Sequence, residues 1–212
     1  MTVASALVEG AAALGLDVDA KAQSTLADYL TLLEKWNRTH NLTAIRDPSQ
    51  MVTHHLLDSL ATLPHLGSDP ALRIIDIGSG GGLPGIPIAI ARPGWSVCLI
   101  DSSHKKAAFL RQAVIELELR NVEVVSQRAE SYSPPTLFSV AISRAFSDLP
   151  SFAAAATRLL NPGGRLVAMK GVYPHEELQQ LSSAHRVVAV PELRVPGIEG
   201  RRHLVIVEMD AP

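Results

Sequence analysis

The chain has 212 residues, of which 47% are hydrophobic and 19% are charged, and its formal net charge at pH 7 is −2. The composition excludes a disordered chain, which would combine low hydrophobicity with high charge, and the length allows one α/β domain with a short extension. The net charge excludes a global electrostatic attraction to nucleic acid. The apolar runs are too short to span a membrane, and the start lacks a basic leader segment. We therefore expect a cytoplasmic protein.

The first 66 residues are predicted to form a helical cap. Apolar residues recur at helical spacing in two segments, first over residues 26–36 and then over residues 51–63. Between them, Asp47 followed by Pro48 has the form of a helix N-cap with its first-turn proline. Only a short turn-like stretch follows the cap, so we expect it to pack directly on a second unit, residues 67–212.

From residue 73 onward, short apolar or β-branched runs alternate with helical periods, which is typical of a parallel sheet with crossover helices. The expected strands are residues 73–78, 96–101, 122–127, 139–146 and 165–171. The expected helices are residues 84–92, 103–119, 148–160 and 174–183. The last two strand-like runs, 187–195 and 201–209, are joined by a turn-rich stretch and predict a closing antiparallel hairpin. The sequence therefore predicts a Rossmann-like α/β fold with a mostly parallel, seven-stranded sheet and an antiparallel C-terminal strand.

A glycine-rich loop, Asp76-Ile77-Gly78-Ser79-Gly80-Gly81-Gly82, follows the first strand and opens a helix. In α/β sheets nucleotides bind at this place, outside the carboxyl ends of the strands. Asp101 ends the second strand, where a carboxylate can accept hydrogen bonds from the ribose hydroxyls of an adenosine. Together the loop and Asp101 predict an adenosine-containing ligand.

Two such ligands are compatible with the pattern. Residues 80–85 also match the G-x-G-x-x-G fingerprint of dinucleotide sites, so NAD is an alternative. S-adenosylmethionine fits better, because Asp76 would repel a pyrophosphate and attract the ammonium group of the methionine. The end of the third strand is expected to close on the adenine. The candidate cofactor-binding residues are Asp76, Gly78, Gly80, Asp101, Ala129 and Glu130.

Several motifs, spread over nearly the whole chain, resemble those of one family. They are Lys35-Trp36-Asn37, Asn41-Leu42-Thr43, Arg46-Asp47-Pro48, His55 with Leu57-Asp58-Ser59, the loop Asp76 to Pro87, Phe109-Leu110-Arg111, Ile142-Ser143-Arg144-Ala145-Phe146, Lys170-Gly171 and Arg202-His203-Leu204. In these motifs the chain resembles the glucose-inhibited division protein B family (GidB, or RsmG). One departure is Gly81, where a proline is usual in the family, and it should affect only the stiffness of the loop.

The resemblance implies the class I methyltransferase fold, S-adenosylmethionine as cofactor and methylation of guanine N7 in 16S, small-subunit ribosomal RNA. It also implies cofactor contacts at matched positions. These positions are Gly78, Leu83, Ala129, Glu130 and Arg144.

The residues independently limit the chemistry. The fourth strand ends in Ser143-Arg144-Ala145-Phe146 rather than the Pro-Pro-aromatic tetrad typical of exocyclic amine methylation, and the only cysteine, Cys98, lies inside the second strand, which disfavours carbon-5 methylation of pyrimidines. Guanine N7 has a free lone pair and needs no general base, so alignment and desolvation suffice. Arg144 is the candidate catalytic residue, as a positioning group. Its alternative interpretation is a strand-end arginine held by a carboxylate.

Basic residues that follow the strands are expected to gather at the same edge and to bind RNA phosphates, with acidic residues such as Glu176 and Glu177 lying elsewhere. Phe146 could stack on a base or belong to the core. The candidate RNA-binding residues are Lys105, Lys106, Arg111, Phe146, Lys170, Arg201 and Arg202. The histidines lack metal-site spacing, so we predict no metal.

The expected partner is small-subunit ribosomal RNA, free or in a 30S assembly intermediate, and the expected state is a monomer. Two other functions stay open at this point. One is an S-adenosylmethionine-dependent methyltransferase that acts on a small molecule or a protein, and the other is a non-catalytic RNA-binding protein on the same scaffold.

Overall fold

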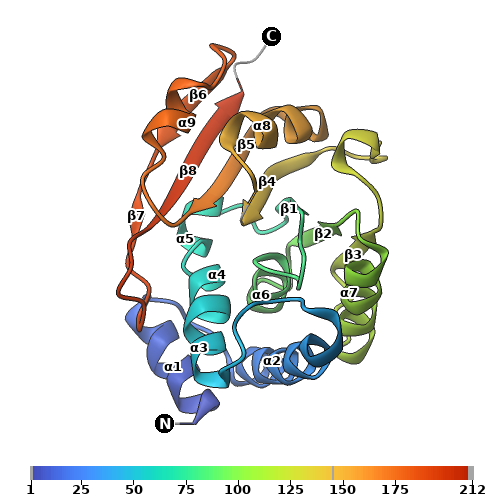
Figure 1. Cartoon of the computed structure of the whole chain (residues 1–212), viewed down its shortest axis with the longest axis vertical. Coiled ribbons are helices and arrows are strands. Elements are labelled where there is room, and N and C mark those ends of the chain that lie inside the picture. The colour runs from blue at the N-terminus through green and yellow to red at the C-terminus, as the bar shows by residue number, and fades with distance from the viewer. Residues whose placement is uncertain (1, 145, 210–212) are drawn as a thin grey trace.

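The computed structural model describes residues 2–144 and 146–209, which form a mixed sheet with helices on both faces (Figure 1). The strands are β1 (Arg73–Ile77), β2 (Ser96–Ile100), β3 (Val122–Val125), β4 (Phe138–Arg144), β5 (Leu160–Lys170), β6 (His185–Ala189), β7 (Glu192–Leu193) and β8 (Arg202–Met209). The helices are α1 (Val3–Ala13), α2 (Ala20–His40), α3 (Pro48–Met51), α4 (Asp58–Leu60), α5 (Leu63–Leu66), α6 (Gly85–Ala91), α7 (His104–Glu116), α8 (Leu149–Ala156) and α9 (His175–Gln179). Three further turns are the π-helical η1 (Val52–Leu57) and the 3-10 turns η2 (Ala129–Ser131) and η3 (Thr157–Leu159).

The strand order is β3-β2-β1-β4-β5-β8-β6, and the short β7 also pairs with β8. Strands β1 to β5 run parallel, and β8 is antiparallel to β5 and to β6. The predicted parallel sheet with a closing antiparallel pair is confirmed, with one difference. The run expected over residues 187–195 is two strands, because Pro191 lacks the N–H that would continue the ladder.

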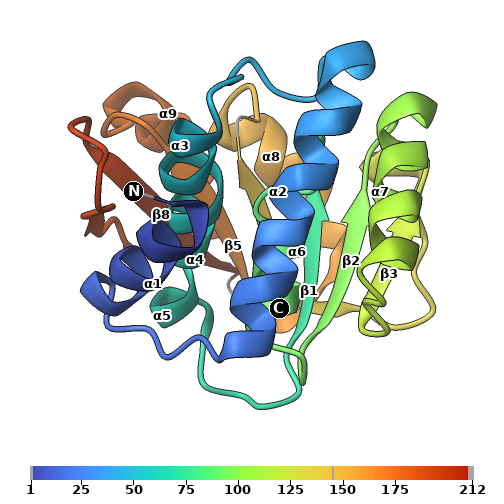
Figure 2. The same ribbon diagram turned by 90° about the horizontal axis from the view of Figure 1, so that it is seen from below.

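Alternate residues of the strands pack on opposite faces of the sheet. In β1, Ile74 belongs to the core beneath α2, α6 and α7, whereas Ile75 belongs to the core beneath α8. Figure 2 shows the first group of helices on the near side of the sheet and α8 behind it. Because the central strands are covered on both faces, their sequences are mostly apolar on both faces, as in other parallel sheets.

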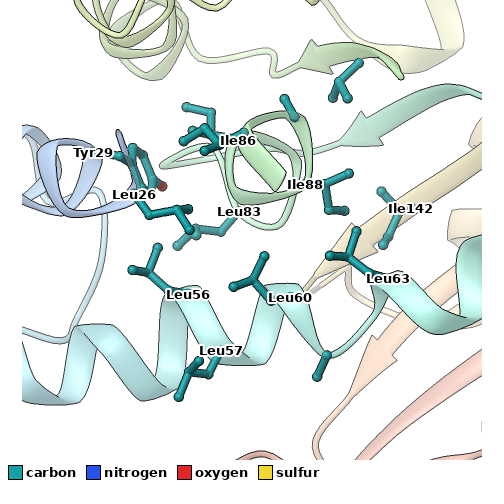
Figure 3. Close-up of a cluster of buried hydrophobic side chains, with 14 of the residues drawn as sticks. Leu26, Tyr29, Leu56, Leu57, Leu60, Leu63, Leu83, Ile86, Ile88 and Ile142 are labelled. Atoms are coloured by element: carbon teal, nitrogen blue, oxygen red, sulfur yellow. The ribbon is translucent and has the colours of Figure 1, made fainter. Parts of the chain in front are cut away.

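The N-terminal helices share the core of the sheet. Leu26 of α2, Leu56 of η1 and Leu60 of α4 are fully buried, and they lie against Leu83 and Ile86 of the glycine-loop region (Figure 3). Burial of each such side chain stabilises the fold by about 1.5–3 kcal/mol. The expected direct packing of residues 1–66 on the rest of the chain is therefore present. The division at residue 66, with the cap as an extension of the domain over residues 67–212, stays a prediction.

The ends of the cap helices follow from capping residues. Helix α2 begins after Asp19, whose Oδ1 accepts a hydrogen bond from the Ala22 amide at 2.7 Å, and it ends at Asn41 in the left-handed conformation. The predicted start at Asp47 is confirmed, since its Oδ1 accepts from the Ser49 amide at 2.8 Å. In the part of the chain that the structure describes, no helix combines the length and the apolar character needed to cross a membrane.

Candidate functional site

Two cavities lie at the carboxyl edge of the sheet, one on each side of the end of β4. The first has a volume of about 330 Å³ and is called the glycine-loop cavity. Its lining comes from the ends of β1 to β3 and from the segment after β4: Ile77, Gly78, Ile100, Asp101, Ser102, Lys106, Gln127, Arg128, Ala129, Glu130 and Phe146. The second has a volume of about 440 Å³ and is called the arginine cavity. Its lining joins the cap to β4, β5 and β8: Thr43, Ala44, Ile45, His54, His55, Asp58, Arg144, Met169, Lys170, Gly171, Leu193, Arg202 and His203.

In the glycine-loop cavity, Asp101 ties the glycine loop to the end of β2. Its Oδ2 accepts a hydrogen bond from the Gly80 amide at 2.9 Å, and its Oδ1 accepts from the Ser103 amide at 2.8 Å. Each carboxylate oxygen has a second lone pair, which a ligand hydroxyl can still use. Gly78 has φ +73°, and a Cβ built there would meet nothing within 4 Å, so the backbone faces open space. Phe146 forms part of the wall and packs on Phe152, with ring centroids 5.4 Å apart.

These features fit an adenosine-containing cofactor. The half-buried Phe146 offers an apolar surface for a purine, and the carboxylate of Asp101 offers acceptors for ribose hydroxyls. Ala129 and Glu130 lie at the same cavity, as the sequence predicted. The lining holds two carboxylates and two cations, Lys106 and Arg128, so its charge alone does not distinguish S-adenosylmethionine from NAD.

Two predicted cofactor residues lie outside this lining. Asp76 is fully buried, and its Oδ2 accepts a hydrogen bond from the Gly85 amide at 2.9 Å, which holds the start of α6. Burial raises the pKa of Asp76 to about 7, and the Gly85 amide opposes that shift. Leu83 is 4% exposed and packs in the apolar core. In this structure Asp76 and Leu83 support the loop from beneath, and the Gly80 amide is bound to Asp101; their predicted roles in cofactor binding stay predictions.

In the arginine cavity, Arg144 at the end of β4 lies beside a carboxylate from the cap. Its Nη1 is 3.5 Å from Oδ2 of Asp58 and donates a hydrogen bond to the His54 carbonyl at 2.8 Å. Nε of Arg202, at the start of β8, is 3.3 Å from the other oxygen, Oδ1. Arg144 thus lines the arginine cavity at the end of β4, and its predicted contact with the cofactor stays a prediction. The alternative of an arginine held by a carboxylate is what the geometry shows.

The π-helical turn η1 leaves the His54 carbonyl free to accept the hydrogen bond from Arg144. In an α-helix, the Asp58 amide would donate to the His54 carbonyl. Here the Asp58 amide donates to the carbonyls of Thr53 and His55 instead, so it does not compete with Arg144 for His54. Sequence periodicity predicted a regular helix over this segment. The structure instead has a π-helical turn where the helix meets the site.

Similarity to known proteins shows the family of this chain. A family model described as rRNA small subunit methyltransferase G matches residues 22–205. The chain belongs to this family, GidB. Ribosomal RNA small subunit methyltransferase G of Nitrosospira multiformis is 52% identical over 215 residues, which covers 98% of each chain. The protein of the same name from Aromatoleum aromaticum is 51% identical over 209 residues, covering 97% of this chain and 98% of that one.

Solved structures with the same fold are more distant. A SAM-dependent methyltransferase from Aquifex aeolicus has a TM-score of 0.57 and 19% identity, and the match covers 84% of this chain and 98% of that one. The cyclase SpnF has a TM-score of 0.64 and 16% identity, with 92% and 98% covered. The fold is thus that of class I methyltransferases, and since it also carries a cyclase, it does not by itself fix the reaction.

The family motifs in the cap of this GidB protein build one wall of the arginine cavity. The side chain of Asn37 accepts a hydrogen bond from the Thr43 amide at 2.9 Å, and Oγ1 of Thr43 lies 2.9 Å from Nε2 of His55. Burial lowers the pKa of His55 to about 4, and the charge of Arg144 adds to this shift, so His55 is neutral at pH 7. The loop over residues 41–47 is thereby fixed beside the cavity.

Three of the six predicted RNA-binding cations are already paired. Lys170 lies 2.7 Å from Glu177, Lys106 lies 3.9 Å from Asp101, and Arg202 pairs with Asp58. The expectation that Glu177 would lie away from the site is wrong, because α9 folds back over the end of β5. Three predicted cations are exposed and have no ion pair among the residues described by the structure: Lys105, Arg111 and Arg201.

These three do not form one patch. Lys105 and Arg111 lie on α7, which packs beside β3, whereas Arg201 precedes β8 on the opposite half of the sheet (Figure 1). The prediction of a single cluster over the cofactor is therefore wrong: the exposed cations lie on two flanks of the carboxyl edge of the sheet.

Sequence reasoning missed Asp58, His54 and His203 as site residues. Asp58 and His203 were visible only as members of family motifs, and His54 acts through its backbone carbonyl, which no side-chain pattern reports. Cys98 is buried, and burial raises its pKa to about 12, so the thiol is unsuited to act as a nucleophile. Among the residues that the structure describes, no cluster of three or more potential metal ligands is found.

Proposed function

We propose that this protein transfers the methyl group of S-adenosylmethionine to N7 of a guanine in small-subunit, 16S ribosomal RNA. The observation that carries the proposal is the pair of cavities that flank the end of β4 in a GidB-family chain. One cavity suits an adenosine, and the other presents arginines to an incoming group.

The glycine-loop cavity holds the cofactor in this proposal. When bound, S-adenosylmethionine supplies a methyl group on a positively charged sulfur, which a lone pair can attack. Asp101 accepts from the ribose hydroxyls, Gly78 lets the cofactor approach the backbone, and the segment of Ala129 and Glu130 closes on the adenine. Phe146 contributes to the wall, where it would face the purine or the target base.

The arginine cavity receives the guanine. N7 must stay bare for the attack, so Arg144 orients the base through O6 or a phosphate and not through N7. No general base is required, which agrees with the weak basicity of His55, whose pKa burial lowers to about 4, and with the pairing of Asp58. The chain therefore contributes alignment and exclusion of water, as in other reactions limited by orientation.

We further infer that the RNA crosses the edge of the sheet between the two flanks. Lys105 and Arg111 would bind phosphates on one side and Arg201 on the other, with both cavities between them. We propose that the enzyme acts as a monomer in the cytoplasm, where small-subunit RNA is assembled, with residues 1–66 as its cap. Free RNA and a 30S assembly intermediate are both candidate substrates.

The test is methyl transfer from labelled S-adenosylmethionine to small-subunit RNA from cells that lack this activity, supplied both as naked RNA and as 30S particles. The expected product after nuclease digestion is 7-methylguanosine, identified by mass spectrometry. Label in another nucleoside would refute the N7 assignment. Cofactor binding without transfer to RNA, but with transfer to a small molecule or a protein, would favour the other methyltransferase function. Binding of RNA with no transfer at all would indicate a non-catalytic protein.

A further inference from the structure

Asp58 is a buried carboxylate placed between two arginines from different strands. It is 4% exposed, its Oδ2 faces Nη1 of Arg144 at 3.5 Å and its Oδ1 faces Nε of Arg202 at 3.3 Å. Asp58 belongs to the N-terminal cap, whereas the arginines belong to the sheet. A buried carboxylate is expensive unless it is paired, so this arrangement links the cap to the sheet at the arginine cavity.

Each arginine has a second anchor that fixes the direction of its guanidinium. Nη1 of Arg144 donates to the His54 carbonyl at 2.8 Å, and Nη1 of Arg202 donates to the Arg201 carbonyl at 3.1 Å. A guanidinium has five N–H donors in a rigid plane. Nη1 of Arg144 thus lies between Asp58 and the His54 carbonyl, and Arg202 faces Asp58 through Nε, which leaves the other donors of both guanidiniums for the cavity that they line.

The carboxylate also offsets charge where the reaction creates it. Asp58 and the two arginines together carry one net positive charge, and without Asp58 they would carry two. Methyl transfer to N7 leaves the guanine ring positively charged, and nearby cations oppose that change. Lys170, in the same lining, is already neutralised by Glu177. Asp58 is therefore the group that keeps the arginine pair compatible with a cationic product.

We propose that Asp58 is a positioning residue for methyl transfer, which orients Arg144 and Arg202 toward the base and limits the positive charge around it. This inference rests on the proposed function, because it concerns the same site. It assigns to the cap a role in the chemical step beyond covering the sheet.

The chain contains a matched control. Glu208, near the end of β8, also pairs with two arginines: Arg165, at 3.0 Å, and Arg186. Arg202 and Glu208 lie at opposite ends of the same strand, so the second triad is far from both cavities. Loss of the carboxylate in either triad breaks two ion pairs, but only Asp58 should affect the reaction.

The experiment compares the single-turnover rate of methyl transfer to small-subunit RNA in the wild-type protein, Asp58→Asn and Glu208→Gln. We expect Asp58→Asn to lower the rate at saturating RNA by about 100-fold, because the reacting groups lose their alignment. Affinity for S-adenosylmethionine, measured by calorimetry, should stay unchanged. Glu208→Gln should keep the wild-type rate, and Asp58→Glu should recover part of the loss.

A purely structural role is distinguished by coupling to Arg144. If Asp58 acts through the arginines, Asp58→Asn in the Arg144→Ala background should lower the rate much less than it does in the wild type. Losses that multiply in the double variant would overturn the proposal. An unchanged rate in folded Asp58→Asn, or a loss accounted for by unfolded protein in thermal melts, would do so too. Failure of the wild-type protein to methylate RNA would instead refute the proposed function.

Discussion

The two cavities at the edge of the sheet are built in different ways. The glycine-loop cavity is made by residues that follow successive parallel strands, β1, β2 and β3, so its members are set by one repeated βα connection. The arginine cavity joins the cap to β4 and to the antiparallel β8, which come from the beginning, middle and end of the chain. The difference teaches that cofactor binding follows a local pattern shared by many enzymes, whereas the substrate side depends on the tertiary packing of this family.

The largest expected effect separates the cavities by function. Arg144→Ala should lower methyl transfer by about 100-fold or more, because Arg144 aligns the base. Its affinity for S-adenosylmethionine should stay at the wild-type level, since the proposed role of Arg144 is to align the base in the cavity that it lines. Arg165→Ala, which removes an arginine from the Glu208 triad, serves as the control. Equal losses of the transfer rate and of the affinity for S-adenosylmethionine in Arg144→Ala would show that Arg144 contacts the cofactor.

The opposite result is expected for Asp101→Ala. It should weaken S-adenosylmethionine binding by about 1.5–3 kcal/mol, since charge-assisted hydrogen bonds to the ribose are lost. Calorimetry measures this directly. Asp69→Ala is a suitable control because Asp69 also accepts from a backbone amide two residues on, that of Ala71 at 2.8 Å, but lies away from both cavities. Unchanged affinity in Asp101→Ala with an intact fold would remove the cofactor from this cavity.

Two glycines with nearly the same conformation sharpen the assignment of the loop. Gly78 has φ +73° and Gly163 has φ +75°, and an added Cβ meets nothing within 4 Å at either position. Alanine at either site should therefore cost about 1–2 kcal/mol of stability through backbone strain. Only Gly78→Ala should also lower the affinity for the cofactor, by about tenfold, which is about 1.4 kcal/mol. Equal cofactor affinity in the two variants would contradict the assigned approach of the ligand to Gly78.

A smaller effect tests whether the cap supports the loop as well as the arginine cavity. The buried hydroxyl of Tyr29 in α2 donates a hydrogen bond to the Gly81 carbonyl at 2.5 Å. Tyr29→Phe should lower the free energy of unfolding by about 1 kcal/mol, as measured in urea. Tyr173→Phe, at a 40% exposed side chain, should leave it unchanged. Equal stabilities would mean that this bond does not hold the loop.

The smallest effect concerns RNA. Arg201→Ala should reduce the slope of log K for RNA against log salt by about one unit, because one phosphate contact is lost. Lys21→Ala on α2 is the control for a general change in charge. The same slope in Arg201→Ala and the wild type would exclude Arg201 from the RNA contact and leave the flank on α7 to be tested alone.

Much of the fold could be predicted because its signals are local. Alternating apolar runs and helical periods predicted β1 to β5 and the crossover helices, and the predicted cap at Asp47 could be found because its hydrogen bond is made within one turn. The split of the last hairpin and the π turn at residues 52–57 were missed, since the first depends on pairing with β8 and the second on packing around the site.

The sequence by itself determined the methyltransferase fold, the family and the residues around the glycine loop, because glycines and a strand-end aspartate have strong local requirements. Only the tertiary structure decided the partners of the charged groups. It buried Asp76 under α6, paired Lys170 with Glu177, and brought Asp58 between Arg144 and Arg202. Ion pairing depends on distances between side chains remote in sequence, and a charge pattern along one chain does not contain them.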